Sequence, residues 1–130
     1  MRWHLSVNQY DLGWLVAFYE GEGSVWAGRS GSGVGSMQFR LHVTQKDPEP
    51  LRHFGSLVQC GRFAKASGKN PCANWIISGR EGVVVAMLLR PHLSLRRQLQ
   101  LDKAIATWGS ASHPRTEAWP KLFVRKAVAG

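Results

Sequence analysis

One stretch of the sequence decides the fold: WLVAFYEGEGSV, residues 14–25. Its apolar first half predicts a short helix that begins near Asp11, a suitable N-cap, and its second half is an acidic, glycine-punctuated segment before a strand. Gly13, Ala17 and Gly21 recur every four residues, so they share one face of this helix. Because residues this small let another backbone come close, we expect this face to pair with a second helix.

Two carboxylates, Glu20 and Glu22, lie at the C-terminal end of the same helix. Negative charge is unfavourable there by roughly 0.3–1 kcal/mol per group, because the helix dipole and the free carbonyl oxygens are negative. If two copies of the helix pair in parallel across a twofold axis, the two Glu22 side chains converge beside carbonyl oxygens, which suits a hard divalent cation. An ordinary core helix followed by two solvated acids is the alternative that these residues leave open.

The charge balance favours a polyanionic partner. The chain has 130 residues, with 17 Lys and Arg against 8 Asp and Glu, hence a formal net charge of +9. Such a surplus indicates nucleic acid first and an acidic membrane surface second, although a basic protein with no nucleic-acid role stays an alternative. Hydrophobic residues make up 44% and charged residues 19%, which are values of a globular chain, so we expect a single domain over residues 1–130.

The two cysteines, Cys60 and Cys72, match no zinc or thioredoxin spacing. We therefore expect both to be reduced, in a cytoplasmic or organellar interior. The apolar run at residues 14–19 is too short to cross a bilayer, and no basic-apolar-small leader precedes it. Secretion and membrane insertion are not expected.

The rest of the chain alternates hairpins with helices. After the first helix, the predicted elements are strands at 24–29 and 36–44, a helix at 47–58, strands at 62–66 and 73–77, and helices at 81–89 and 94–108. On the last helix we expect five side chains to face the core: Leu95, Leu99, Leu101, Ile105 and Trp108. The order predicts an α+β domain with a four-stranded antiparallel sheet, whose helix-free face forms a saddle.

The strand at 36–44 has the clearest periodicity. Met37, Phe39, Leu41 and Val43 point to one side, the core, and polar residues point to the other. The polar side presents hydrogen-bonding groups about every second residue, which suits the reading of base edges in a major groove. A merely solvated sheet face is the alternative.

Residues 15–23, LVAFYEGEG, resemble the signature of the LAGLIDADG homing endonucleases, which ends in acid-Gly-acid-Gly after an apolar helix. Val16 and Ala17 stand where that signature usually has Ala and Gly. The order of elements also matches the αββαββα core of that family over about residues 12–108, with 109–130 as a C-terminal extension. A single motif in this family implies a homodimer, with Gly13, Ala17 and Gly21 in the dimer interface.

The resemblance implies a site-specific homing endonuclease that makes metal-dependent double-strand breaks with four-base 3′ overhangs in long pseudo-palindromic DNA. The implied cofactor is Mg²⁺, with Mn²⁺ as a substitute and with Ca²⁺ binding without cleavage. The implied partners are double-stranded DNA and a second copy of the chain, with no membrane and no small-molecule substrate.

The resemblance also assigns catalytic positions in this chain. Glu22 matches the metal-binding catalytic acid, and Gly21 matches the glycine whose backbone contributes to the metal site. Gln45 matches a polar residue that positions solvent near the scissile phosphate. Arg96, with Arg97 as its substitute, matches a basic residue that is often Lys. Since Arg does not readily release a proton, its role would be charge stabilisation.

The implied DNA contacts lie on the sheet face and its turns. They are Ser30, Ser32, Gln38, Arg40, His42, Arg62, Lys65, Lys69, Asn70 and Asn74. One departure is Glu49, which stands where close relatives carry a basic residue near the active centre. Two other functions stay open: a cleavage-inactive member acting as an intron maturase or DNA-binding regulator, and a basic ribosomal-type RNA protein.

Overall fold

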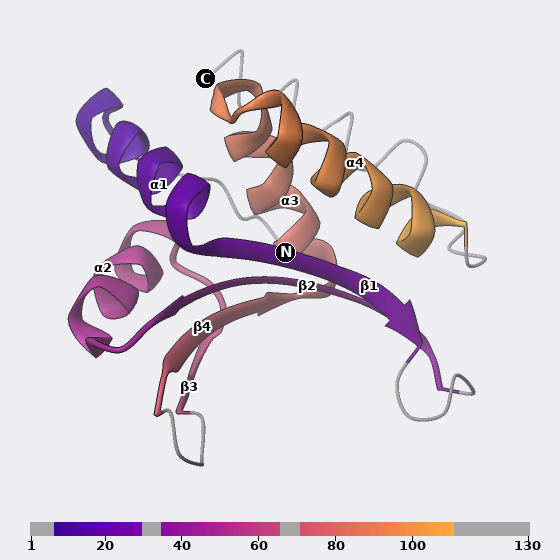
Figure 1. The fold of residues 1–130 in the computed structure, drawn as a ribbon, viewed down its shortest axis with the longest axis horizontal. Coiled ribbons are helices and arrows are strands. Elements are labelled where there is room, and N and C mark those ends of the chain that lie inside the picture. Colours follow the sequence, from indigo (N-terminus) through magenta and orange to yellow (C-terminus); the bar gives the residue numbers. More distant parts are fainter. Residues whose placement is uncertain (1–6, 30–34, 66–70, 111–130) are drawn as a thin grey trace.

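The computed structural model describes residues 7–29, 35–65 and 71–110. In chain order these residues form α1 (Gln9–Glu22), β1 (Gly23–Arg29), β2 (Met37–Gln45), α2 (Pro48–Val58), β3 (Arg62–Lys65), β4 (Ala73–Ser78), α3 (Gly79–Leu89), the 3₁₀ turn η1 (Arg90–His92) and α4 (Leu95–Gly109). The strands form one antiparallel sheet in the order β1-β2-β4-β3 (Figure 1). The predicted α+β architecture is confirmed.

The four α-helices lie on one face of the sheet, and the described residues leave the other, curved face uncovered (Figure 1). The interior strand β2 shows the predicted alternation. Phe39, Leu41 and Val43 are buried toward the helices, and Arg40, between two of them, is exposed on the open face. The sheet therefore separates a hydrophobic layer from a polar surface.

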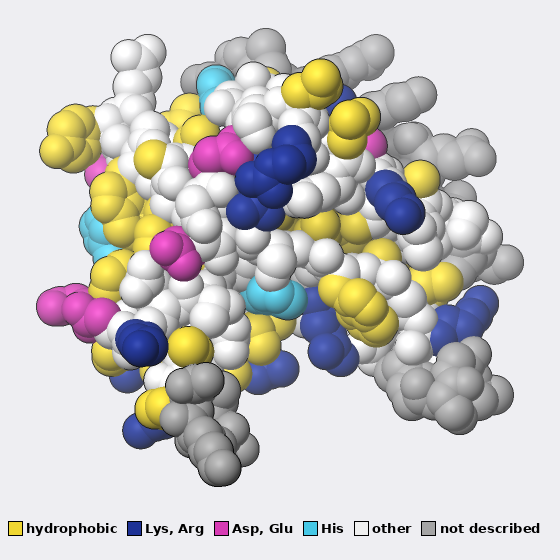
Figure 2. Space-filling model, in the orientation of Figure 1, with side chains coloured by type: hydrophobic (Ala, Val, Ile, Leu, Met, Phe, Trp, Pro, Cys, Tyr) yellow, Lys and Arg dark blue, Asp and Glu magenta, His cyan; other side chains and the backbone are white. Residues whose placement is uncertain are grey.

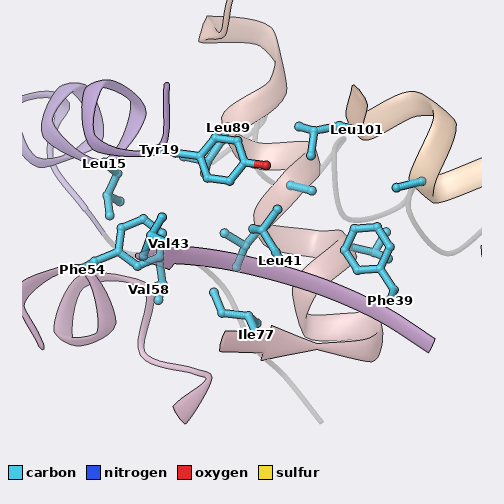
Figure 3. Close-up of a cluster of buried hydrophobic side chains, with 14 of the residues drawn as sticks. Leu15, Tyr19, Phe39, Leu41, Val43, Phe54, Val58, Ile77, Leu89 and Leu101 are labelled. Carbon is cyan, nitrogen blue, oxygen red and sulfur yellow. The ribbon is translucent and has the colours of Figure 1, made fainter. Parts of the chain in front are cut away.

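The core is built where α1, α3 and α4 meet the sheet (Figure 3). Leu15, Tyr19, Leu89 and Leu101 are fully buried together with Leu41. Burying one aliphatic side chain of this kind stabilises a fold by about 1.5–3 kcal/mol. These contacts fix the position of α1 on the sheet.

The first helix begins earlier than predicted. Its N-cap is Asn8, whose Oδ1 accepts a hydrogen bond from the backbone N–H of Asp11 at 2.8 Å. The prediction that Asp11 caps the helix was wrong, because Asp11 supplies the capped N–H instead. At the other end α1 continues through Glu22, and β1 follows directly at Gly23. A Cβ atom on Gly23 would collide with the Tyr19 ring, so this direct junction requires glycine.

The buried face of α4 differs from the predicted one. Leu101, Ala104 and Trp108 are buried, whereas Leu95 and Leu99 are 69% and 58% exposed. The prediction that Leu95 and Leu99 face the core was wrong. On a helix of 3.6 residues per turn, positions 99 and 101 point about 200° apart, so they cannot face the same layer.

Cys60 and Cys72 are free thiols, as predicted. Burial raises the pKa of the Cys60 thiol to about 12, with a smaller effect from the Glu81 carboxylate. Among the described residues, no helix has the length and apolar character needed to span a membrane.

Candidate nucleic-acid interface

The open face of the sheet carries polar, basic and aromatic side chains. Residues paired across an antiparallel ladder share a face, and the register pairs Trp26 with Arg40 and Gly28 with Gln38. The other outward positions, from the same registers, are Ser24, His42, Thr44, Arg62, Ala64, Asn74, Ile76 and Ser78. None of these described outward residues is acidic. Figure 2 shows Lys and Arg side chains gathered along the lower part of the molecule, below the sheet in that view.

Several of these side chains are held in place before any ligand binds. Arg40 donates from Nη2 to Oε1 of Gln38 at 2.7 Å, and its guanidinium carbon lies 5.2 Å from the centroid of the Trp26 ring. The Thr44 hydroxyl donates to Oδ1 of Asn74 at 2.6 Å, across the β2–β4 ladder. The open face is therefore an organised surface.

His42 is half-buried in the middle of this face. Burial, and to a lesser extent the positive charge of Arg40, lowers the pKa of its imidazole below 6.5. The ring is therefore neutral at pH 7, so one nitrogen donates and the other accepts a hydrogen bond.

The structure brings five of the predicted DNA contacts together on the open face: Gln38, Arg40, His42, Arg62 and Asn74. Lys65 is placed differently, since it pairs with the buried Ala73 and so points to the helix side of the sheet. Four predicted contacts lie outside the described residues: Ser30, Ser32, Lys69 and Asn70. Trp26 was missed, although the alternation along β1 and its pairing with β2 could have placed it beside Arg40.

A second group of polar contacts joins the end of α1 to the start of α4. The Glu20 carboxylate accepts hydrogen bonds from the backbone N–H of Ser94 at 2.7 Å and from its hydroxyl at 2.9 Å. Ser94 is the N-cap of α4, and its Oγ also accepts from the backbone N–H of Arg97 at 3.3 Å. These hydrogen bonds, with the charges of Arg97 and Arg96, lower the pKa of the Glu20 carboxyl, against a smaller opposing effect of burial. Glu20 therefore stabilises the N-terminus of α4.

The two arginines of this junction have different environments. Arg97 has an 11% exposed side chain and donates from Nε and Nη2 to the Glu20 carbonyl oxygen, at 3.2 and 3.0 Å. Arg97 thus satisfies a backbone carbonyl at the C-terminal end of α1 that has no partner within the helix. Arg96 is 65% exposed and its Nη2 lies 3.9 Å from the Glu20 carboxylate. Of the two, Arg96 is the one whose charge is available to a ligand.

Glu22 lies exposed at the last position of α1. Within the described part of the chain, no hydrogen bond or ion pair engages its carboxylate. Gly23 is opposite Val43 in the ladder, so the last residue of β2, Gln45, runs past the point where α1 enters the sheet. Gln45 is half-buried there. Arg96 lies beside Glu20, two residues before Glu22, and Gln45 follows Val43, the ladder partner of Gly23, by two residues.

The oxygen atoms at the C-terminal end of α1 are of the type that binds a hard divalent cation, but they are too few to fill its coordination shell. The Glu22 carboxylate and main-chain carbonyls are oxygen ligands of the kind that Mg²⁺ and Ca²⁺ prefer. Among the described residues, no three His, Cys, Asp or Glu side chains gather into a metal-binding group. A cation bound at Glu22 would therefore need oxygen atoms from a second subunit, from the backbone or from a phosphate.

The described residues leave the outer face of α1 uncovered. Gly13, Ala17 and Gly21 are all exposed, and a Cβ atom on Gly13 or Gly21 would have no neighbour within 4 Å. Tyr10, at the start of the helix, is 85% exposed. The three small residues predicted to share a face therefore lie on an open strip of α1 in the described part of the chain.

No protein-family model and no curated protein matches this sequence. The fold, in contrast, resembles several solved structures. The homing endonuclease I-CvuI, solved with its target in the presence of Ca, shares 16% identity, with a TM-score of 0.62 over 93% of this chain and 82% of that one. The archaeal intron-encoded homing endonuclease I-Vdi141I, solved with DNA, shares 16% identity, with a TM-score of 0.59 over 92% and 83%. The LAGLIDADG meganuclease I-AabMI, bound to uncleaved DNA, has a TM-score of 0.64 at 16% identity, over 95% of this chain but 43% of that one.

The chain therefore has the fold of the LAGLIDADG homing endonucleases, and the resemblance seen in its sequence is confirmed at the level of the fold.

Proposed function

We propose that this protein is a DNA endonuclease that acts as a homodimer and, with Mg²⁺, hydrolyses one phosphodiester in each strand of a long, near-palindromic site. The observation that carries the proposal is the junction of α1 and β1. There an exposed carboxylate, Glu22, is followed directly by a strand of the acid-free sheet face. A basic concave surface with a reactive group at its border suits a polyanion that is both bound and cut.

The outer face of α1 supports the homodimer. Gly13, Ala17 and Gly21 leave the helix backbone accessible to a second helix, and α1 ends at Glu22. Pairing of two α1 helices in parallel would bring both Glu22 carboxylates together and join the two open sheet faces into one longer surface. The lengths of the similar structures are consistent with a homodimer. This chain spans 82% of I-CvuI but 43% of I-AabMI, whose chain has room for a second such domain.

The residues at the end of α1 supply the groups that phosphodiester hydrolysis needs. Glu22, with the Gly21 carbonyl, would hold Mg²⁺, which when bound lowers the pKa of water and neutralises charge on the phosphate. The Gln45 amide would orient the attacking water. The exposed guanidinium of Arg96 would stabilise the negative charge that develops on the phosphate, and it remains protonated throughout.

The test is incubation of the purified protein with a randomised-site DNA library in Mg²⁺, Mn²⁺ or Ca²⁺, with both bound and cut sequences read. We expect near-palindromic sites to be cut in Mg²⁺ and Mn²⁺, leaving 3′ overhangs, and to be bound but uncut in Ca²⁺. The variant Glu22→Gln should bind the same sites and lose cleavage by at least about 100-fold, since the charge that holds the cation is removed. Glu81→Gln, the same change on the first turn of α3, is the matched control and should cut normally.

Two outcomes would contradict the proposal. Selective DNA binding without cutting in any of the metals would instead favour a cleavage-inactive regulator or maturase. An absence of selective DNA binding, together with binding of structured RNA, would favour the RNA-protein alternative.

A further inference from the structure

The contact between Trp26 and Arg40 lies on the open face, between the edge strand β1 and the interior strand β2. The two residues are ladder partners on β1 and β2, and Arg40 is exposed in the middle of an interior strand. The other described arginine on this face, Arg62, lies at its margin at the start of the edge strand β3, whereas Arg29 pairs with Met37 and points to the helix side. In a duplex the phosphates border each groove and the base edges form its floor. A concave sheet that enters a groove therefore presents its margins to phosphates and Arg40 to bases.

The guanidinium of Arg40 is held from two sides. The Trp26 indole lies 5.2 Å away, within the range of a cation–π contact, and Oε1 of Gln38 accepts from Nη2 at 2.7 Å. The indole in turn lies over Gly28, where a Cβ atom would come within 2.9 Å of the ring. Any larger residue at position 28 would displace the indole from this position.

A long side chain that is fixed before binding loses less conformational entropy when it binds. Arginine presents several N–H donors in a planar fork, and the fork matches the O6 and N7 acceptors that guanine displays in the major groove. One donor of Arg40 is already used by Gln38, and no other described residue accepts a hydrogen bond from its guanidinium.

We infer that Trp26, Gln38 and Arg40 form one guanine-reading unit, in which Arg40 contacts the base and Trp26 and Gln38 are positioning residues. The inference rests on the proposed function in two respects, the binding of duplex DNA by this sheet face and the pairing of two copies of the chain on a near-palindromic site. It does not depend on cleavage. Each protomer would thus specify one G·C pair at a fixed place in its half-site.

The experiment measures binding, in Ca²⁺, to the selected site and to all single-base-pair variants of it, for the wild type, five variants of the Trp26, Gln38 and Arg40 unit, and one control variant. For the wild type we expect one G·C pair per half-site whose replacement weakens binding roughly tenfold or more. Arg40→Ala should remove this discrimination at that pair alone, and Arg40→Lys should remove most of it although the charge is kept. Trp26→Ala and Gln38→Ala should reduce the discrimination severalfold while Arg40 is intact, and Trp26→Phe, which keeps an aromatic face, should restore part of it.

Arg62→Ala is the matched control, since Arg62 is an exposed arginine on the same face at its margin. It should weaken binding to all sequences alike and lower the salt dependence of binding by about one counterion. Trp26→Ala and Gln38→Ala should leave the salt dependence of binding unchanged. A general loss of structure would change it. Melting curves of the free variants verify that each is folded.

Four results would overturn the inference. If Arg40→Ala weakens binding equally to all sequences, Arg40 contacts phosphate. If Arg40→Ala removes the discrimination but Trp26→Ala and Gln38→Ala do not reduce it, these two are not positioning residues. If the wild type binds no duplex selectively, both the inference and the proposed function fail. If the wild type binds selectively but Arg40→Ala does not change the selectivity, only the inference fails.

Discussion

The carboxylate of Glu20 accepts hydrogen bonds from the backbone N–H and the hydroxyl of Ser94, 74 residues later in the chain, at 2.7 and 2.9 Å. The first acid of the motif thus stabilises the N-terminus of α4, whereas the second, Glu22, is exposed and has no such partner among the described residues. Two carboxylates separated by a single glycine therefore have different tasks. Glu20 joins α1 to α4, and the carboxylate of Glu22 is exposed to solvent.

We predict that Glu20→Ala lowers the free energy of unfolding by about 1–2 kcal/mol and that Ser94→Ala lowers it by about 1 kcal/mol, because each removes hydrogen bonds at a helix N-terminus. The double variant should lose less than the sum, since both changes remove the same contact. Glu22→Ala is the control and should stay within about 0.5 kcal/mol of the wild type. Urea unfolding at a fixed protein concentration measures all four.

The contact between Glu20 and Ser94 should also make the stability of the protein depend on pH in the acid range. Since the pKa of Glu20 is lowered in the folded state, its stabilisation is complete above the ordinary carboxyl pKa of 4.5 and is lost as the pH falls through the lowered value. The wild type should therefore lose more stability than Glu20→Gln below pH 4.5. Equal acid dependence of the two proteins would show that the carboxylate is not engaged in solution.

The exposed strip on α1 leads to a prediction about assembly. Ala17→Glu should leave each copy of the chain folded, since Ala17 is exposed, and should convert the proposed dimer to a monomer, because two charges would face each other in a close helix contact. Ala106→Glu, at an exposed alanine on α4, should leave the dimer intact. Analytical ultracentrifugation distinguishes the two states. A wild type that sediments as a monomer at all concentrations would refute the homodimer.

The packing of α2 against β4 can be tested at a glycine. Gly55 is buried, and a Cβ atom there would collide with the Trp75 ring, whose Nε1–H donates to the Cys60 carbonyl at 2.9 Å and so limits its movement. Gly55→Ala should destabilise the protein by about 1–3 kcal/mol. Gly109→Ala, on α4 with no neighbour within 4 Å, should be neutral or stabilising by up to about 1 kcal/mol. Thermal melts of both variants give the comparison.

His42 predicts a second pH dependence. Its pKa is lowered in the folded protein, first by burial and then by the Arg40 charge, from an ordinary value of 6.5. The unfolded chain therefore takes up this proton at a higher pH, so stability falls as the pH is lowered through 6.5 and levels off below the folded pKa. His42→Gln should reduce this fall, and His92→Gln, at an exposed histidine, should leave it unchanged. Unfolding curves between pH 5 and 8 measure the slope.

Most of the element order could be predicted because helix and strand periodicity are properties of consecutive residues. The alternation of Met37, Phe39, Leu41 and Val43 gave the correct core side of β2, and the predicted starts of α2 and α4, at residues 47 and 94, lie one residue before the observed ones. The orientation of α4 was not predicted correctly, since Leu95 and Leu99 are as apolar as Leu101. Which leucines are buried depends on how the helix lies against the sheet.

By itself, the sequence determined the α+β class, the strip of small residues on α1, the acidic end of that helix and the polar side of β2, because each is a pattern of near neighbours in the chain. The tertiary structure alone decided that Glu20 caps α4 while Glu22 stays exposed, and that Trp26 supports Arg40 on the open face. These depend on residues of different elements, which come together only when the hydrophobic layer brings the helices onto one face of the sheet.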